Sequence, residues 1–145
     1  MKSQIAFIFF VMISMAACTQ HRTQLQPDGN IVPDPATYTK VQWMDSIKDF
    51  GTINMGDSVR ISFICKNVGD KPLMLTQVKP GCGCTLADYT HEAILPGGEG
   101  FVTGIFNSNR AHPGEVRKSI FVTTNTPDGI NHTLTFTGKI VQPLE

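Results

Sequence analysis

The sequence has no long apolar run and no excess of charge, and each absence excludes a class of protein. Its 145 residues carry 12 basic and 12 acidic side chains, so the formal net charge is zero. A nearly neutral domain lacks the basic surface that binds nucleic acid, and no lysine or arginine cluster is present for anionic lipid. The most apolar stretch, Ile5 to Met15, has about eleven residues, whereas a membrane-spanning helix needs about 20. We therefore expect neither nucleic-acid binding nor a transmembrane helix.

The sequence also lacks the residue patterns of common catalytic and metal sites. It has no Gly-x-Ser-x-Gly nucleophile motif, and its acidic residues are spread singly. The glycine-rich stretch 96–100 is followed by no helix whose N-terminus could bind phosphate. We expect no conventional enzyme, no catalytic residue, no cofactor and no metal site. The four histidines never have the i, i+4 spacing of a metal-binding helix, and each is expected at the surface or in a loop: His21, His91, His112 and His132.

The N-terminal segment has the features of a secretory signal peptide. Lys2 supplies a positive charge, the apolar run follows, and small residues lead directly to Cys18. The stretch from Met15 to Cys18 resembles the lipobox of bacterial lipoproteins, although the usual leucine is Met15 here. The resemblance implies that residues 1–17 are removed and that Cys18 carries lipid. Cleavage by an ordinary signal peptidase, which would leave Cys18 as a plain thiol, is the alternative.

Residues 18–40 are expected to form the lipidated cysteine and a flexible tether. Three prolines and an Asp-Gly turn signal interrupt the stretch, and no helical or strand period runs through it. Thr19 follows Cys18, where some inner-membrane lipoproteins carry an acidic residue. By resemblance to known sorting, we expect a lipid anchor in the outer membrane of the cell envelope, with its facing open. Disulfides can persist in that compartment.

Residues 41–145 are expected to form one β-sandwich domain. Apolar and polar residues alternate in short segments, turn residues separate the segments, and no convincing helix is present. This pattern predicts an all-β, antiparallel sandwich of about seven to eight strands. Phe63, Ile120, Leu134 and Phe136 are the expected core residues. The clearest predicted strands are residues 58–66, 73–78, 101–107, 116–123 and 133–140.

A series of motifs in this domain resembles domain-of-unknown-function family 1573, found in bacterial secreted and lipid-anchored proteins. The resemblance runs from about Val41 to Val141, and implies an immunoglobulin-like sandwich of the Hydin and major-sperm-protein type, with no assigned reaction. Two departures are Gly81, where serine is usual, and Cys65, where an apolar or small residue is usual. The motifs are Asp49-Phe50-Gly51-Thr52-Ile53, Gly56-Asp57, Phe63, Asn67-x-Gly69-Asp70-x-Pro72-Leu73, Cys82-Gly83-Cys84-Thr85, Pro96-Gly97, Phe106-Asn107-Ser108, Gly114, Lys118, Thr124-Asn125-Thr126 and Gly138.

Cys82 and Cys84 are the candidate redox or disulfide pair. Residues i and i+2 of a strand have Cα atoms about 6.6–6.8 Å apart, which is near the limit for a disulfide, although the neighbouring glycines permit a tighter turn. Such a bridge closes a three-residue loop and is worth only about 1.6 kcal/mol. Two alternatives stay open, a Cu(I) site on the two sulfurs and a bridge from Cys65. We expect Cys65, on the core face of its strand, to be buried and free.

The expected function is that of a non-enzymatic, membrane-anchored module that binds or scaffolds an unknown protein or glycan partner in the cell envelope. The aromatic side chains Tyr38, Trp43 and Tyr89 could stack on such a partner, but more often residues of this kind fill the rim of a sandwich core. A different class of function is the alternative, namely a thiol redox or Cu(I)-handling protein that acts through Cys82 and Cys84. Fold alone does not decide between them.

Overall fold

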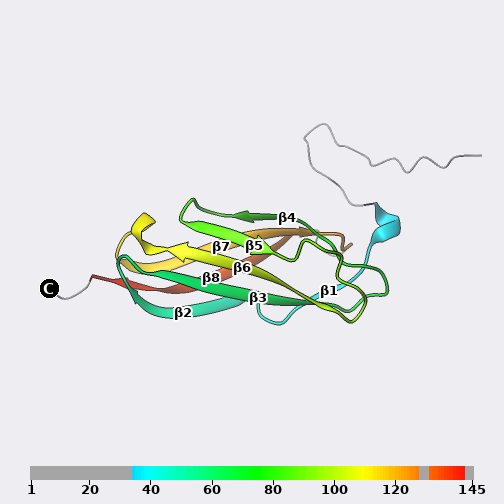
Figure 1. The fold of residues 1–145 in the computed structure, drawn as a ribbon, viewed down its shortest axis with the longest axis horizontal. Helices are drawn as coiled ribbons and strands as arrows, with labels where there is room; N and C mark the ends of the chain where they lie inside the picture. Colours follow the sequence, from blue (N-terminus) through cyan, green and yellow to red (C-terminus); the bar gives the residue numbers. More distant parts are fainter. Residues whose placement is uncertain (1–33, 128–130, 143–145) are drawn as a thin grey trace, which may run out of the picture.

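In the part of the chain that the structure describes, eight strands form two four-stranded sheets that pack face to face (Figure 1). The structure is a computed structural model, and it describes residues 34–127 and 131–142. Within these residues no helix has the length and hydropathy to cross a membrane. The strands are β1 (Val41–Trp43), β2 (Ile47–Asn54), β3 (Ser58–Asn67), β4 (Leu75–Pro80), β5 (Thr85–Tyr89), β6 (Glu99–Asn107), β7 (Gly114–Thr124) and β8 (Asn131–Val141), with short 3-10 helices η1 (Pro35–Thr37) and η2 (Ser108–Arg110).

The two sheets differ in strand direction. The first sheet has the order β1-β3-β6-β5 and is antiparallel throughout. The second has the order β2-β8-β7-β4, and its β2 runs parallel to β8. The all-antiparallel expectation is therefore wrong for this one pair. Only strands joined by a tight hairpin must be antiparallel, and β2 and β8 lie at opposite ends of the domain sequence.

The core lies between the sheets, where the alternating apolar residues of both inner faces meet. Phe63, Ile120, Leu134 and Phe136 are all fully buried, as the alternation predicted. Phe106 and Phe136 lie with ring centroids 5.8 Å apart. Aromatic pairs at this separation contribute beyond their buried area. The sandwich is thus held by apolar side chains from β3, β6, β7 and β8.

Strand boundaries were predicted well where alternation is strong and poorly where it is weak. The predicted strand 73–78 is observed as β4, Leu75–Pro80, because Leu73 instead forms an isolated bridge with Ile94. β1, β2 and β5 were not delimited. β1 and β5 have only three and five residues, too few to establish a period of two. β2 is an edge strand of its sheet and is mostly exposed.

The last residues before β1 contact the sandwich. The Thr39 side chain is buried, and its hydroxyl donates to Asn67 Oδ1 at 3.0 Å. The amide of Asn125 donates to the Thr37 carbonyl at 2.7 Å. Residues 37–39 are therefore bonded to the sandwich. The predicted signal peptide, the lipidation site Cys18 and the tether up to residue 33 lie outside the described residues.

Candidate functional site

The CGC loop, residues 81–84, carries the chain from one sheet to the other. β4 ends at Pro80 in the second sheet, and β5 begins at Thr85 in the first. The Gly81 N–H donates to the Ser119 carbonyl at 2.8 Å, which fixes the start of the loop on β7. The Asn107 N–H donates to the Cys84 carbonyl at 3.0 Å, which fixes its end on β6. Both ends of the loop are thus held by the sandwich framework.

Cys82 and Cys84 are joined by a disulfide in this loop. Their Cα atoms are 5.3 Å apart, closer than two such residues in a straight strand, because the chain turns between β4 and β5. The Thr85 N–H, which donates to the Cys82 carbonyl at 3.4 Å, closes this turn. The two cysteines differ in burial. Cys84 is 7% exposed and belongs to the core cluster, whereas Cys82 is half-buried at its edge.

A hydroxyl and a guanidinium lie beside the disulfide. The buried Thr85 places its Oγ1 3.6 Å from Cys82 Sγ and 3.9 Å from Cys84 Sγ. Arg110, the last residue of η2, donates from Nη1 to the Gly83 carbonyl at 3.1 Å. Arg110 also lines a surface hollow of about 360 Å³ formed by residues 110–118. The loop is therefore bonded to a cation that lines the hollow, and its Cys84 packs in the core.

Cys65 lies too far from this loop to join it. On β6, Cys65 pairs with Gly100, whereas Cys84 is bonded to Asn107, seven residues further along. At about 3.3 Å per residue this is roughly 23 Å, and a disulfide needs Cα atoms within about 7 Å. A bridge from Cys65 is thus excluded. Cys65 is buried and free, and burial raises the pKa of its thiol, which keeps it protonated and unreactive.

Neither the loop nor the rest of the described chain gathers a set of metal ligands. Within residues 34–127 and 131–142, no three side chains of His, Cys, Asp or Glu lie close enough to hold a metal ion. Zinc in proteins takes about four such ligands. The Cu(I) alternative has the two sulfurs alone, and these are bonded to each other.

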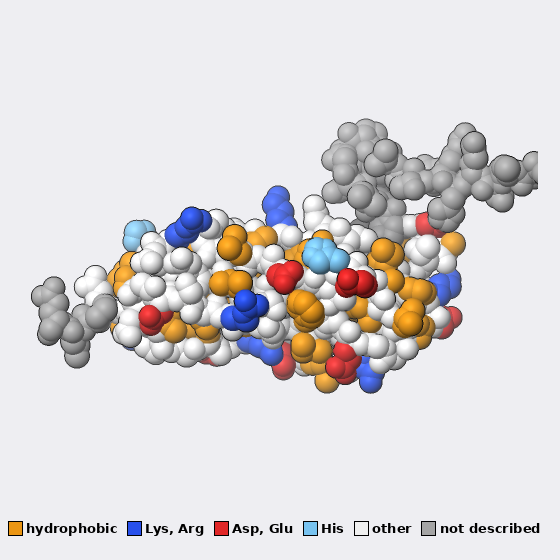
Figure 2. Space-filling view, in the orientation of Figure 1, with side chains coloured by type: hydrophobic (Ala, Val, Ile, Leu, Met, Phe, Trp, Pro, Cys, Tyr) orange, Lys and Arg blue, Asp and Glu red, His pale blue; other side chains and the backbone are white. Residues whose placement is uncertain are grey.

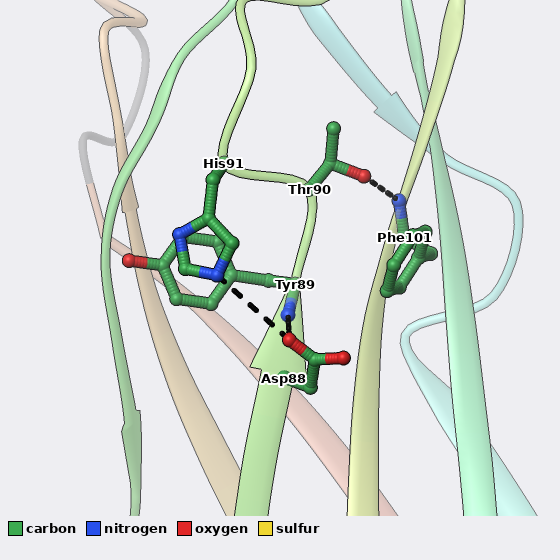
Figure 3. A network of polar contacts seen from close by, with 5 residues as sticks. All are labelled: Asp88, Tyr89, Thr90, His91 and Phe101. Carbon is green, nitrogen blue, oxygen red and sulfur yellow. Dashed lines mark hydrogen bonds and ion pairs between the residues drawn. The ribbon is translucent and has the colours of Figure 1, made fainter.

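The histidines occupy different environments. His91 is exposed beyond the end of β5, with its ring 4.1 Å from the Tyr89 ring and its Nε2 3.8 Å from Asp88 Oδ1 (Figure 3). His112 is also exposed. His132 is not a surface or loop residue, because it lies on the inner face of β8 and is half-buried. Its Nε2 lies 3.0 Å from the Thr124 hydroxyl, and burial lowers its pKa. His21 lies outside the described residues.

The three aromatic residues considered for partner stacking are all half-buried. Trp43 and Tyr89 pack against the core cluster, which agrees with a role at the sandwich rim. The indole of Trp43 lies 5.9 Å from the His132 ring. Its Nε1 is buried and has no hydrogen-bond partner among the described residues.

The outer side of the first sheet carries apolar side chains where a solvated sheet would carry polar ones. Two cross-strand rows each carry an apolar pair. Ile64 pairs with Phe101 in one, and Leu86 pairs with Ile105 in the other. The Met44 N–H donates to the Ile64 carbonyl, which brings β1 up to the first row. Figure 2, which views this side, shows hydrophobic side chains exposed among scattered charges. We call Met44, Ile64, Leu86, Phe101 and Ile105 the apolar face.

Sequence reasoning did not identify the apolar face or Arg110. The sequence did contain a signal for the apolar face. Ile64 is the one apolar residue among the outward-facing positions of β3, which are otherwise polar or charged. Arg110 had no local signal. It lies 27 residues from Gly83, and only the folded position of η2 brings the two together.

Comparison with known proteins identifies a family and a fold. The family model described as "Protein of unknown function (DUF1573)" matches residues 41–140. No curated protein matches the chain. A protein of unknown function from Porphyromonas gingivalis W83 is 17% identical with a TM-score of 0.63, over 74% of this chain and 49% of that one. This chain thus spans about half the length of that protein.

Two further solved structures have the same fold at low identity. The ASH/PapD-like domain 7 of human CEP192 is 14% identical with a TM-score of 0.56, over 86% of this chain and 98% of that one. The E. coli chaperone DraB is 10% identical with a TM-score of 0.50, over 73% of this chain and 56% of that one. At these identities the likeness shows the fold alone. It confirms the immunoglobulin-like β-sandwich predicted from the sequence.

Proposed function

Because the chain belongs to the DUF1573 family, whose function is unknown, we propose a function from its surface: a non-enzymatic β-sandwich module that binds a protein partner in the cell envelope. The binding surface is the apolar face of the first sheet. The module is held at the membrane by lipid on Cys18, and the chain between Cys18 and the bonded residues 37–39 separates it from the lipid. The observation that carries the proposal is the pair of apolar rows on an outward sheet face.

The exposure of these side chains supports binding. Leu86 is 68% exposed, Met44 57% and Phe101 39%. Single exposed apolar residues are common, but neighbouring ones on one face mark an interaction site. Here Met44 approaches Ile64, which in turn pairs with Phe101. Burying apolar surface is worth about 25 cal/mol per Å², so covering these rows would favour association.

The polar residues between the rows are compatible with a covered surface. Ser62 and Thr103 lie opposite each other, and their hydroxyls are 2.8 Å apart in a hydrogen bond. A partner that covers this pair therefore leaves neither hydroxyl without a bond. Asp88 pairs with Thr103 in the polar row between the two apolar pairs, and Arg60 pairs with Ile105 at the end of the second row. Protein–protein interfaces combine apolar contacts with about one hydrogen bond per 100–200 Å², so a partner can bond these polar groups where it covers the apolar pairs.

A protein partner fits this surface better than a glycan does. Glycan sites rely on exposed aromatic rings and on many hydrogen-bonding side chains. In the apolar face four of the five side chains are aliphatic, and the one ring, Phe101, is 39% exposed. The described aromatic residues Trp43 and Tyr89 are engaged at the core rim. The partner is therefore a protein.

The test is a quantitative cross-linking experiment in intact cells with matched surface variants. We compare the full-length protein with the double variant Leu86→Ser, Phe101→Ser and with the control Phe121→Ser. Phe121 is 49% exposed but lies on β7 in the second sheet. We expect the double variant to lose about 90% of its cross-linked protein adduct, since hot-spot truncation costs about 1.4 kcal/mol or more, and the control to keep it. Equal adduct yields from both variants would show that the apolar face does not bind the partner.

A further inference from the structure

The disulfide of the CGC loop presents its two sulfurs unequally. Cys84 is 7% exposed and packed in the core cluster, whereas Cys82 is half-buried at the edge of that cluster. We propose that this loop is a thiol–disulfide exchange site for a partner dithiol, in which Cys82 Sγ is the sulfur that is attacked. This activity is separate from the apolar face and does not depend on it.

The fold has little need of the bridge for its stability. A disulfide that closes three residues removes about 1.6 kcal/mol of chain entropy, about half the value for a 15-residue loop. The backbone bonds Gly81 N–H to Ser119 and Asn107 N–H to Cys84 hold both ends of the loop without it. Reduction would therefore leave the loop in place. A bond that can be opened without unfolding is suited to exchange.

The surroundings of the sulfurs favour a thiolate leaving group. Thr85 Oγ1 lies within 3.9 Å of both sulfurs. Since a hydroxyl hydrogen rotates freely, it can donate to whichever sulfur carries the charge. Arg110 holds its guanidinium at the Gly83 carbonyl, between the two cysteines in sequence. Nearby cations and donors stabilise thiolates, which favours the reduced loop over the disulfide.

The exchange is balanced in two steps. A partner thiolate attacks Cys82 Sγ and forms an intermolecular disulfide, and the electron pair of the broken bond goes to Cys84 Sγ. The second thiolate of the partner then attacks the partner's own sulfur in that mixed disulfide and releases Cys82 as a thiolate. The partner dithiol is oxidised to a disulfide, and the loop takes up two electrons and two protons. With a partner disulfide the same steps run in reverse.

A hollow that shares Arg110 with the loop gives a partner a place to approach. It has a volume of about 360 Å³ and is lined by residues 110–118, including Arg110, which is bonded to the loop. Three of its lining residues carry a positive charge, Arg110, Arg117 and Lys118, against one acid, Glu115. This excess favours the approach of a thiolate or an acidic segment that carries one.

The first test asks which sulfur reacts. The full-length protein is purified in detergent as Cys84→Ser and as Cys82→Ser, and each is exposed to oxidised glutathione. Mixed-disulfide formation is followed by mass spectrometry, and circular dichroism verifies the fold. We expect the Cys84→Ser protein, which retains Cys82, to react at least about tenfold faster because its sulfur is accessible. Equal rates, or a faster Cys84, would overturn the assignment.

The second test asks whether Arg110 and Thr85 act on the thiolate. The equilibrium of the wild-type loop with reduced and oxidised glutathione is compared with that of Arg110→Gln and Thr85→Val. Each should shift about two- to fivefold toward the disulfide, the size of an exposed charge interaction. Thr85→Ser, which keeps the hydroxyl, and Lys40→Gln, which removes an exposed charge outside the loop and the hollow, should not shift it.

Two results would contradict the proposal. One is an unchanged glutathione equilibrium in both variants, and the other is a disulfide that resists excess dithiothreitol while the domain stays folded. The Leu86→Ser, Phe101→Ser double variant tests whether thiol–disulfide exchange is independent of the apolar face. It should exchange with glutathione as the wild type does, whatever happens to its partner adduct.

Discussion

The ring of Phe50 on β2 lies where a Cβ on Gly138 of β8 would sit. The second sheet therefore requires glycine at this position. We predict that Gly138→Ala lowers the free energy of unfolding by about 1–3 kcal/mol, because the added methyl group must displace a packed ring. Gly83 is the control, since a Cβ there would have no atom within 4 Å. Gly83→Ala should be neutral or slightly stabilising in the same urea titration, and a matching loss would contradict the packing argument.

Asn67 joins three loops to the end of β3. Its Nδ2 donates to the carbonyls of Lys71 at 2.7 Å and Ile94 at 2.8 Å. Its Oδ1 accepts from the Gly69 N–H and the Thr39 hydroxyl, both at 3.0 Å. The side chain is fully buried. We predict that Asn67→Ala costs about 3 kcal/mol in chemical denaturation, because buried polar partners are left unpaired.

The matched control for this prediction is Asn131→Ala. Asn131 is exposed, and its Oδ1 accepts one bond, from the Thr123 hydroxyl at 3.0 Å. Its replacement should cost less than about 1 kcal/mol. Similar losses of unfolding free energy for both variants would mean that the buried hydrogen bonds of Asn67 add little to stability.

His132 should make stability depend on pH. Burial lowers its pKa below the usual 6.5, so between the two values the unfolded chain binds more protons than the folded protein. The stability that the neutral, buried His132 contributes is fully present above pH 6.5 and is lost as the pH falls below that value. We predict that the midpoint of thermal unfolding drops on acidification from pH 7 to about 5. His132→Gln should weaken this dependence and His112→Gln, at an exposed site, should not; equal slopes in all three proteins would refute the role of His132.

Cys18 should decide where the protein resides. If it carries lipid, the wild type will be found in the membrane fraction and released by detergent but not by high salt, since acyl chains bind by apolar burial. Cys18→Ala should be soluble or remain unprocessed. Cys65→Ala, at the buried free cysteine, controls for loss of a thiol. Membrane retention of Cys18→Ala at the wild-type level would argue against the anchor.

The parts of the fold that were predictable from sequence are those with a strong local signal. Phe63 lies in a ten-residue strand whose burial alternates over seven consecutive positions, so both the strand and the buried side could be inferred. β5 has five residues and follows a turn, so it is too short to show the two-residue alternation of a strand. The direction of β2 depends on its pairing with β8, and nothing in the local sequence encodes it.

The candidate sites show the same limit. The Cys-Gly-Cys motif is local and was visible at once, and the burial of Cys65 followed from its place on the Phe63 face. By contrast, the contact between Arg110 and Gly83 spans 27 positions, and the exclusion of a Cys65 bridge required the register of β3 against β6. Such relationships arise from tertiary pairing, which a single sequence does not reveal.

The most direct test of the binding proposal is site-specific photo-crosslinking in intact cells. A benzophenone side chain replaces Leu86 on the apolar face in one protein and Phe121 on the second sheet in another. The two positions are comparably accessible, at 68% and 49% exposure, so they differ chiefly in the face they report. The account predicts a discrete protein adduct from position 86 and none from position 121. The same adduct from both positions, or none from position 86, would contradict it.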